Sequence, residues 1–289
     1  MSTSFTEKQL VVSITLDGEK MSFPGFATTV HIQKQGAPEL PKASIQLFGL
    51  SEDKLAQLTL LSFDGLSLRP NRVEVMAGDS TGMSLCFEGE ITNSAPDFNV
   101  APSPVLNIEA ITAAYSKLLP QSPVSVMGSQ SVESLMETFA ADAGLTFRNE
   151  GVSTSLSNCT ISGDPITKMQ WVADTIGADL IIDDSEVVLV PTSGTRGQLL
   201  TVTAINPETG QIGYPSFDSM GIRCSCFFRP DLMVAGYCRI ESSLPRASGV
   251  WKIYSVTHEL AANLPGGGPW MSTLSLIHIS EPTRLRCIS

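Results

Sequence analysis

The sequence contains one literal match to a catalytic motif. Gly78-Asp79-Ser80-Thr81-Gly82 fits the G-x-S-x-G pattern of serine hydrolases, in which a strand precedes the serine and a helix follows it. The residues after Gly82 alternate like a second strand, so the pattern predicts a hairpin turn instead. Outside the C-terminal stretch considered below, the possible bases are His31 and His258, both in strand-like runs. A hydrolase that uses Ser80 stays a remote alternative, and it requires Ser80 within hydrogen-bond reach of one of these histidines.

Two other groups of side chains have the chemistry of metal ligands. Cys224 and Cys226 lie on one face of an expected strand, but a tetrahedral zinc site needs two further ligands at suitable spacing. Buried structural cysteines are the favoured interpretation. Asp183 and Asp184 form a carboxylate pair without a calcium-binding loop around it, and adjacent acidic residues in a short turn are typically solvated.

The remaining candidate residues are interpreted as surface or junction residues and not as reactive groups. Glu133 and Glu137 are four residues apart on an expected helix, which is typical of a polar face. Trp171 lies between the apolar positions of a second helix, where it either covers a domain junction, the favoured interpretation, or faces a partner. The sequence has no glycine-rich phosphate-binding motif. We therefore predict no catalytic residue, no cofactor-binding residue, no metal ligand and no enzymatic activity.

Composition excludes several classes of protein. The 289 residues are 42% hydrophobic and 16% charged, which excludes an intrinsically disordered chain. The net charge of −11 argues against tight nucleic-acid binding, which needs clustered Lys and Arg. No apolar run approaches the roughly 18 residues of a membrane span, and residues 1–8 do not resemble a secretion signal. Six cysteines without a C-x-x-C pair indicate a reduced, intracellular assembly compartment.

Hydrophobic periodicity predicts three regions of different character. Two expected helices mark the middle region: one is capped by Ser131 and closed by Gly144, the other is capped by Asp164 and closed by Gly177. A hairpin through 183–185 follows them. Before this region, alternation predicts strands at 10–16, 26–32, 43–47, 72–77, 84–92 and 105–112, with a short helix after Ser51. After it, strands are predicted at 199–204, 222–228, 233–240 and 251–260.

These patterns predict a mainly β protein of the α+β class, with two β-barrel-like domains flanking a small α/β domain. The expected domains are 1–118 for the first barrel with one short helix, 119–196 for the α/β insertion and 197–273 for the second barrel. Residues 274–284 resemble, residue for residue, the translation of a common transposase sequencing adapter. We therefore expect 274–289 to be an artefactual tail outside the fold, with the natural C-terminus missing.

Three short motifs follow one another in an informative order. Gly49-Leu50-Ser51 is followed by Leu58-Thr59, and Phe87-Glu88-Gly89-Glu90-Ile91 is followed by Asp97-Phe98 and Pro102. The third motif, Ser122-Pro123-Val124-Ser125 with Gly128, opens the expected insertion. Together they resemble the trimeric baseplate hub family of contractile bacteriophage tails, which is related to the hub part of type VI secretion spike proteins. The resemblance covers about residues 20–273.

The resemblance implies a structural virion protein that assembles in the host cytoplasm and resides in the tail baseplate. Hub subunits form homotrimer rings, in which two similar barrels per subunit give pseudo-sixfold symmetry. Such a ring joins the sixfold tail tube to the threefold central spike and surrounds the DNA channel, with DNA only as a passenger and no membrane insertion. An acidic channel would let DNA slide without sticking, because like charges repel.

One alternative from another class stays open beside the hub. It is a different tail module or a carbohydrate-binding β-sandwich, which would need exposed aromatic side chains clustered in a groove. Aromatic residues are 7% of the chain and dispersed along it.

Overall fold

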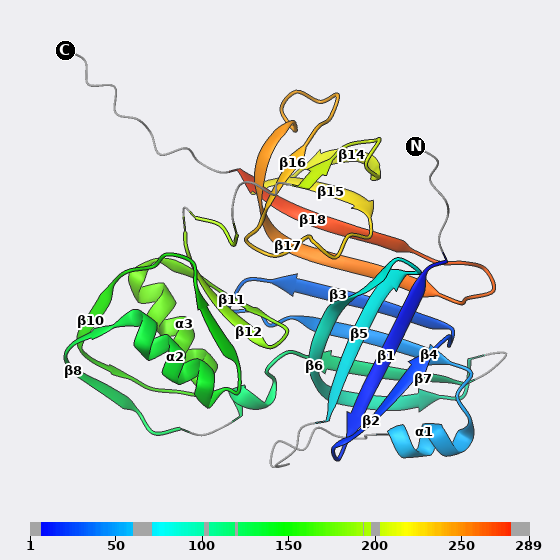
Figure 1. Ribbon diagram of the computed structural model, residues 1–289, viewed down its shortest axis with the longest axis horizontal. Helices are drawn as coiled ribbons and strands as arrows, with labels where there is room; N and C mark the ends of the chain where they lie inside the picture. The colour runs from blue at the N-terminus through cyan, green and yellow to red at the C-terminus, as the bar shows by residue number, and fades with distance from the viewer. Residues whose placement is uncertain are drawn as a thin grey trace.

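The computed structural model describes residues 7–59, 71–100, 104–118, 121–192, 194–197 and 203–278. Of the described residues, 54% lie in strands and 13% in helices, so the fold is mainly β, as predicted. Figure 1 shows the β strands of the two ends of the chain side by side, with the α/β insertion projecting from one flank. Within the described ranges, none of the helices combines the length and apolar character that a bilayer span requires.

The described residues of the first region form one helix and seven strands, and in the strands apolar side chains alternate with polar ones. In β1, Val12 and Ile14 point into a core, and the strand turns at Asp17-Gly18 into β2, which the sequence patterns did not reveal. The elements are β1 (Gln9–Leu16), β2 (Glu19–Pro24), β3 (Thr28–Gln35), β4 (Lys42–Phe48), α1 (Glu52–Leu58), β5 (Arg72–Asp79), β6 (Gly82–Asp97) and β7 (Val105–Ile111).

The insertion has its own core between two helices and two small sheets. Ser131 caps α2 by accepting a hydrogen bond from the Ser134 amide, and Asp164 caps α3 in the same way. Gly177 ends α3 in the left-handed conformation, as its glycine predicts. After the short 3-10 helix η1 (Tyr115–Lys117), the elements are β8 (Val124–Ser131), α2 (Val132–Asp142), β9 (Thr146–Asn149), β10 (Ser155–Ile161), α3 (Pro165–Ile176), β11 (Ala178–Asp183) and β12 (Glu186–Pro191).

The last region returns to β structure around a third core. Its strands are β13 (Thr203–Ile205), β14 (Gln211–Phe217), β15 (Gly221–Phe227), β16 (Tyr237–Ile240), β17 (Gly249–Ala262) and β18 (Trp270–His278). The strand expected at 199–204 lies partly outside the described residues. The strand expected at 233–240 is shorter than predicted, because Ala235 adopts a positive φ of 60° that interrupts extended structure.

The two β regions share one sheet. β3 and β17 pair along eight residues, so 13 strands join in the order β14-β15-β18-β17-β3-β4-β7-β6-β5-β1-β2, with β16 and β13 branching from β17. Each β region keeps a separate core. Among the described strands, hydrogen bonding closes no barrel, so the two expected barrels are not confirmed. The pairing of β3 with β17 joins the two β regions into one sheet. Sequence periodicity predicts strands but does not predict which strands pair, so it could not indicate this arrangement.

The expectation that residues 274–289 lie outside the fold is wrong for 274–278. These residues form the second half of β18 and pair with both β15 and β17. Leu274 and Leu276 are buried in the third core, while Ser275 and Ile277 point to the other face. Strand pairing depends on side-chain alternation and not on the origin of a segment, so Leu-Ser-Leu-Ile continues the strand that Trp270 begins. Residues 279–289 lie outside the described residues.

Candidate assembly surface

The candidate catalytic residues do not form a catalytic arrangement. Ser80 occupies the predicted hairpin turn between β5 and β6. His31 on β3 has its Nε2 2.8 Å from the side-chain nitrogen of Gln33. His258 on β17 is buried, with its Nδ1 2.8 Å from the Ser272 hydroxyl, and burial lowers its pKa to about 3. Across the described part of the chain, no hydrogen bond joins Ser80 to either histidine.

The cysteines behave as buried apolar residues. Cys224 and Cys226 point into the third core together with Cys238, which the sequence pattern did not connect to them. Burial raises the pKa of Cys224 to about 11 and that of Cys226 to about 12, so both thiols are protonated at neutral pH. The described residues hold no cluster of three or more side chains suited to a metal ion.

The interpretation of Asp183 and Asp184 as a solvated turn is wrong. This turn joins β11 to β12 where the insertion meets the large sheet, and the side chains of Asp183 and Asp184 are only 11% and 19% exposed. Lys34 on β3 donates to Asp183 Oδ1 at 2.6 Å and to both Asp184 oxygens at 3.1 Å. The Glu88 amide on β6 donates to Asp184 Oδ1 at 2.9 Å. The turn therefore fastens the insertion to two strands that are distant in sequence, which no local pattern could indicate.

Arg196 completes this charge cluster from the opposite side. Its guanidinium donates to Asp183 Oδ2 at 2.6 Å and to Glu186 Oε2 at 2.8 Å. Burial opposes the negative charge of Asp183, but Lys34 and Arg196 outweigh it and lower the pKa of that carboxyl. Burial and the neighbouring Asp183 charge raise the pKa of Asp184. The cluster is structural: it neutralises buried charges and fixes the position of the insertion.

Of the expectations for side chains on the two helices, one agrees with the structure and the other does not. Glu133 and Glu137 are exposed on α2, as the polar-face interpretation predicts. Trp171 is exposed on α3, so the preferred interpretation, that it covers a domain junction, is not confirmed.

The glycines of the hub-like motifs occupy restricted backbone positions and do not position reactive groups. A Cβ added at Gly89 would lie 2.5 Å from the ring of Phe87, so this β6 position accepts only glycine without displacing the ring. Gly49 and Gly128 have φ values of 80° and 75°, in the left-handed region that favours glycine. Leu50 and Leu58 are buried around α1. These glycines and leucines of the motifs therefore have a role in folding.

One hairpin gathers exposed apolar side chains. Tyr214 is 76% exposed and Phe217 is 56% exposed on β14, which is the end strand of the large sheet. The exposed apolar side chains of this β14–β15 hairpin are Ile212, Tyr214, Phe217, Met220 and Phe227, and we call this set the apolar hairpin. Exposed apolar side chains gathered on one hairpin are typical of an interaction site.

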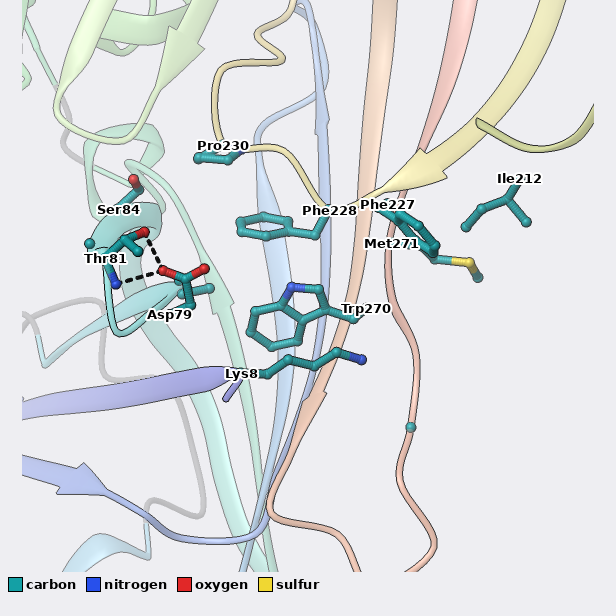
Figure 2. Close-up of a pocket in the computed structure, with 14 residues that line it drawn as sticks. Lys8, Asp79, Thr81, Ser84, Ile212, Phe227, Phe228, Pro230, Trp270 and Met271 are labelled. Carbon is teal, nitrogen blue, oxygen red and sulfur yellow. Dashed lines mark hydrogen bonds between the residues drawn. The ribbon is translucent and has the colours of Figure 1, made fainter. Parts of the chain in front are cut away.

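A groove of about 690 Å³ continues this surface toward β5 and β6. Ile212 and Phe227 belong to the groove and to the apolar hairpin. Figure 2 shows Phe228, Trp270 and Lys8 in a column, with the Asp79–Thr81 turn on one side of it and Phe227, Met271 and Ile212 on the other. The groove thus lies between the first and last β regions.

The groove clusters aromatic residues that are dispersed in the sequence, which is the feature that the carbohydrate-binding alternative requires. Trp270 does not present a free ring, however. The Lys8 ammonium lies 5.7 Å from its ring centroid, and Phe228 packs edge-on at 5.4 Å between centroids. Sugar stacking needs an open aromatic face, so this geometry does not favour the alternative.

Comparison with known families matches residues 9–263 to a family described as "Baseplate hub gp41". No curated protein matches the chain. Among solved structures, the prophage MuSo2 43 kDa tail protein from Shewanella oneidensis has a TM-score of 0.64 at 9% identity, covering 93% of this chain and 96% of that one. The tail protein from Neisseria meningitidis MC58 has a TM-score of 0.66 at 9% identity, with the same coverage.

A third similar structure comes from a secretion system. The E. coli c3393 protein, a component of the type VI secretion system with structural similarity to T4 bacteriophage tail proteins gp27 and gp5, has a TM-score of 0.60 at 11% identity. The match covers 89% of this chain and 74% of that one. Identities this low show a shared fold alone, whereas the family match spans most of the sequence and confirms the resemblance inferred from the motifs. This chain belongs to the baseplate hub gp41 family of bacteriophage tail proteins.

Proposed function

We propose that this protein is a structural baseplate hub subunit that forms a homotrimer ring and has no catalytic role. The ring joins the sixfold tail tube to the threefold central spike and surrounds the DNA channel. The subunit is assembled in the host cytoplasm and resides in the tail baseplate of the virion. The observation that carries this proposal is the family match over residues 9–263.

The architecture supports a symmetry adaptor. Two β regions with separate cores lie in one continuous sheet, so each subunit can present two comparable β modules around an axis. Three subunits would present six such modules, which matches a sixfold tube on one side while the ring keeps threefold symmetry for the spike. In this proposal the two modules take the place of the two barrels expected from the sequence.

The charge of the chain supports a channel through which DNA passes without binding. The net charge is −11, and a surface that carries the same sign as the phosphates repels DNA. The proposal requires the acidic side chains to face the axis of the ring. An assembled ring with its acidic residues on the outside would overturn this part of the proposal.

The test is co-production of the full chain with the tail tube and central spike proteins of the same phage. We expect a complex containing three copies of this chain, measured by light scattering, together with antibody labelling at the baseplate end of purified tails. Omitting the spike or the tube protein provides the control for each contact. A chain that binds neither protein and is missing from purified tails would refute the hub function.

A further inference from the structure

The apolar hairpin is electrically neutral on an acidic protein. Residues 211–227 contain two charged side chains, Asp218 and Arg223, whose charges cancel. Asp218 lies in the turn, where its carboxylate accepts hydrogen bonds from the Met220 and Gly221 amides at 2.8 Å each. The whole chain carries a net charge of −11. The hairpin therefore combines exposed aromatic surface with the absence of net charge.

This combination identifies the kind of partner. Two copies of a chain with a net charge of −11 repel each other wherever their acidic surfaces meet, so a contact between copies is most favourable at a neutral surface. Apolar side chains supply the attraction there, because burying them removes apolar area from water. A basic partner protein would instead gain most from the acidic surfaces elsewhere on the chain.

The backbone of the hairpin indicates how the contact is made. β14 is an end strand of the sheet, but its register with β15 shifts between Ile212 and Ser216. Gly213 has a φ of 68°, and Pro215 has no amide hydrogen to donate. These interruptions prevent a regular strand from adding to β14. The contact is therefore made by the side chains of Tyr214 and Phe217.

The other end of the same sheet lacks this character. β2 carries Glu19, Lys20 and Pro24, and such charges and prolines are typical of edges that avoid association. The sheet thus has one charged end and one neutral, aromatic end.

We propose that the apolar hairpin is the contact between copies of this chain, with Tyr214 and Phe217 as its anchors. This inference rests on the self-association proposed above and assigns it to a surface. Ile212 and Phe227, on the opposite face of the hairpin from Phe217, belong to the neighbouring groove. Because the copies carry like net charges, salt strengthens the contact by screening their repulsion.

The experiment is sedimentation velocity of the full chain over a concentration series at 0.05 M and 0.5 M salt. The test variant carries Tyr214→Ser and Phe217→Ser. The matched control carries Phe98→Ser and Met127→Ser, which remove side chains that are 63% and 92% exposed elsewhere on the surface. We expect the test variant to weaken self-association by about tenfold or more, as for aromatic anchors at protein interfaces. The control should associate like the wild type, and high salt should tighten association of the wild type.

A second measurement identifies the contact directly. A photo-crosslinking residue in place of Tyr214 should give a covalent dimer, whereas the same residue in place of Met127 should not. A wild type that stays monomeric at every concentration and salt, or a test variant that associates like the wild type, overturns the inference. Tails in which the test variant still enters a threefold hub would refute this contact while leaving the hub function intact. Absence of the wild-type chain from tails would refute the function itself.

Discussion

Replacing Lys34 with methionine tests whether the buried charge cluster fixes the insertion to the large sheet. Lys34 Nζ lies 2.6 Å from Asp183 Oδ1 and 3.1 Å from Asp184 Oδ2, and the Lys34 side chain is only 11% exposed. Methionine keeps most of the aliphatic stem and removes the positive charge. The substitution therefore leaves the two carboxylates buried with less compensation.

The magnitude follows from what remains after the substitution. Removing one partner of a buried ion pair costs about 3–5 kcal/mol of unfolding free energy. Arg196 still pairs with Asp183, and the Glu88 amide still donates to Asp184, so we expect the lower end, about 3 kcal/mol. For a chain of this size that corresponds to a fall in Tm of about 6–12 °C.

The matched control is Lys20→Met. Lys20 Nζ lies 2.6 Å from Glu74 Oε2, the same separation as the Lys34–Asp183 pair, but the Lys20 side chain is 52% exposed. An exposed pair contributes about 0–1 kcal/mol, so this variant should unfold close to the wild type. Thermal unfolding of both variants, with hydrogen exchange of the β11–β12 turn, measures the difference. Equal Tm values for the two variants would refute the conclusion that the cluster stabilises the junction.

Three further outcomes are expected. A chain ended after Thr273 loses the two buried leucines of β18 and should unfold about 4 kcal/mol or more below a chain ended after His278; equal stability by chemical denaturation would contradict the placement of β18. His258 stays neutral when folded but protonates near pH 6.5 when unfolded, so the unfolding free energy should fall between pH 7 and pH 5. His258→Asn should flatten that dependence, and an unchanged slope would show that this histidine is not the cause. In the native protein a thiol reagent should label the partly exposed Cys159 and leave the buried Cys226 unmodified until unfolding; rapid native labelling of Cys226, located by mass spectrometry, would contradict its burial.

The charge cluster also bears on the proposed role in the baseplate. In the proposed ring, the insertion and the large sheet need a defined relative position. Lys252 adds a second connection by donating to Asp179 Oδ2 at 2.7 Å and to the Thr192 carbonyl at 3.1 Å. Both connections join the α/β insertion to strands of the large sheet, one on β3 and the other on β17.

Local sequence determined the helices and most strands. Asp164, Pro165 and Gly177 specify where α3 begins and ends, because capping, a preset φ and a left-handed end are properties of single residues. Alternation of apolar residues located β1 and β5 for the same reason. β14 was missed because its glycine and proline interrupt the alternation, and β10 because most of its side chains are polar and outside the cores.

The sequence by itself determined most element types, the mainly β class and, through three short motifs, the family. Tertiary structure alone decided that β3 pairs with β17, that 274–278 complete β18, and that Asp183 and Asp184 are buried beside Lys34. It also brought the apolar hairpin together with the groove. The physical reason is sequence separation. Propensity, capping and periodicity act within a few residues, whereas strand order and charge burial depend on segments that are tens to hundreds of residues apart in the chain.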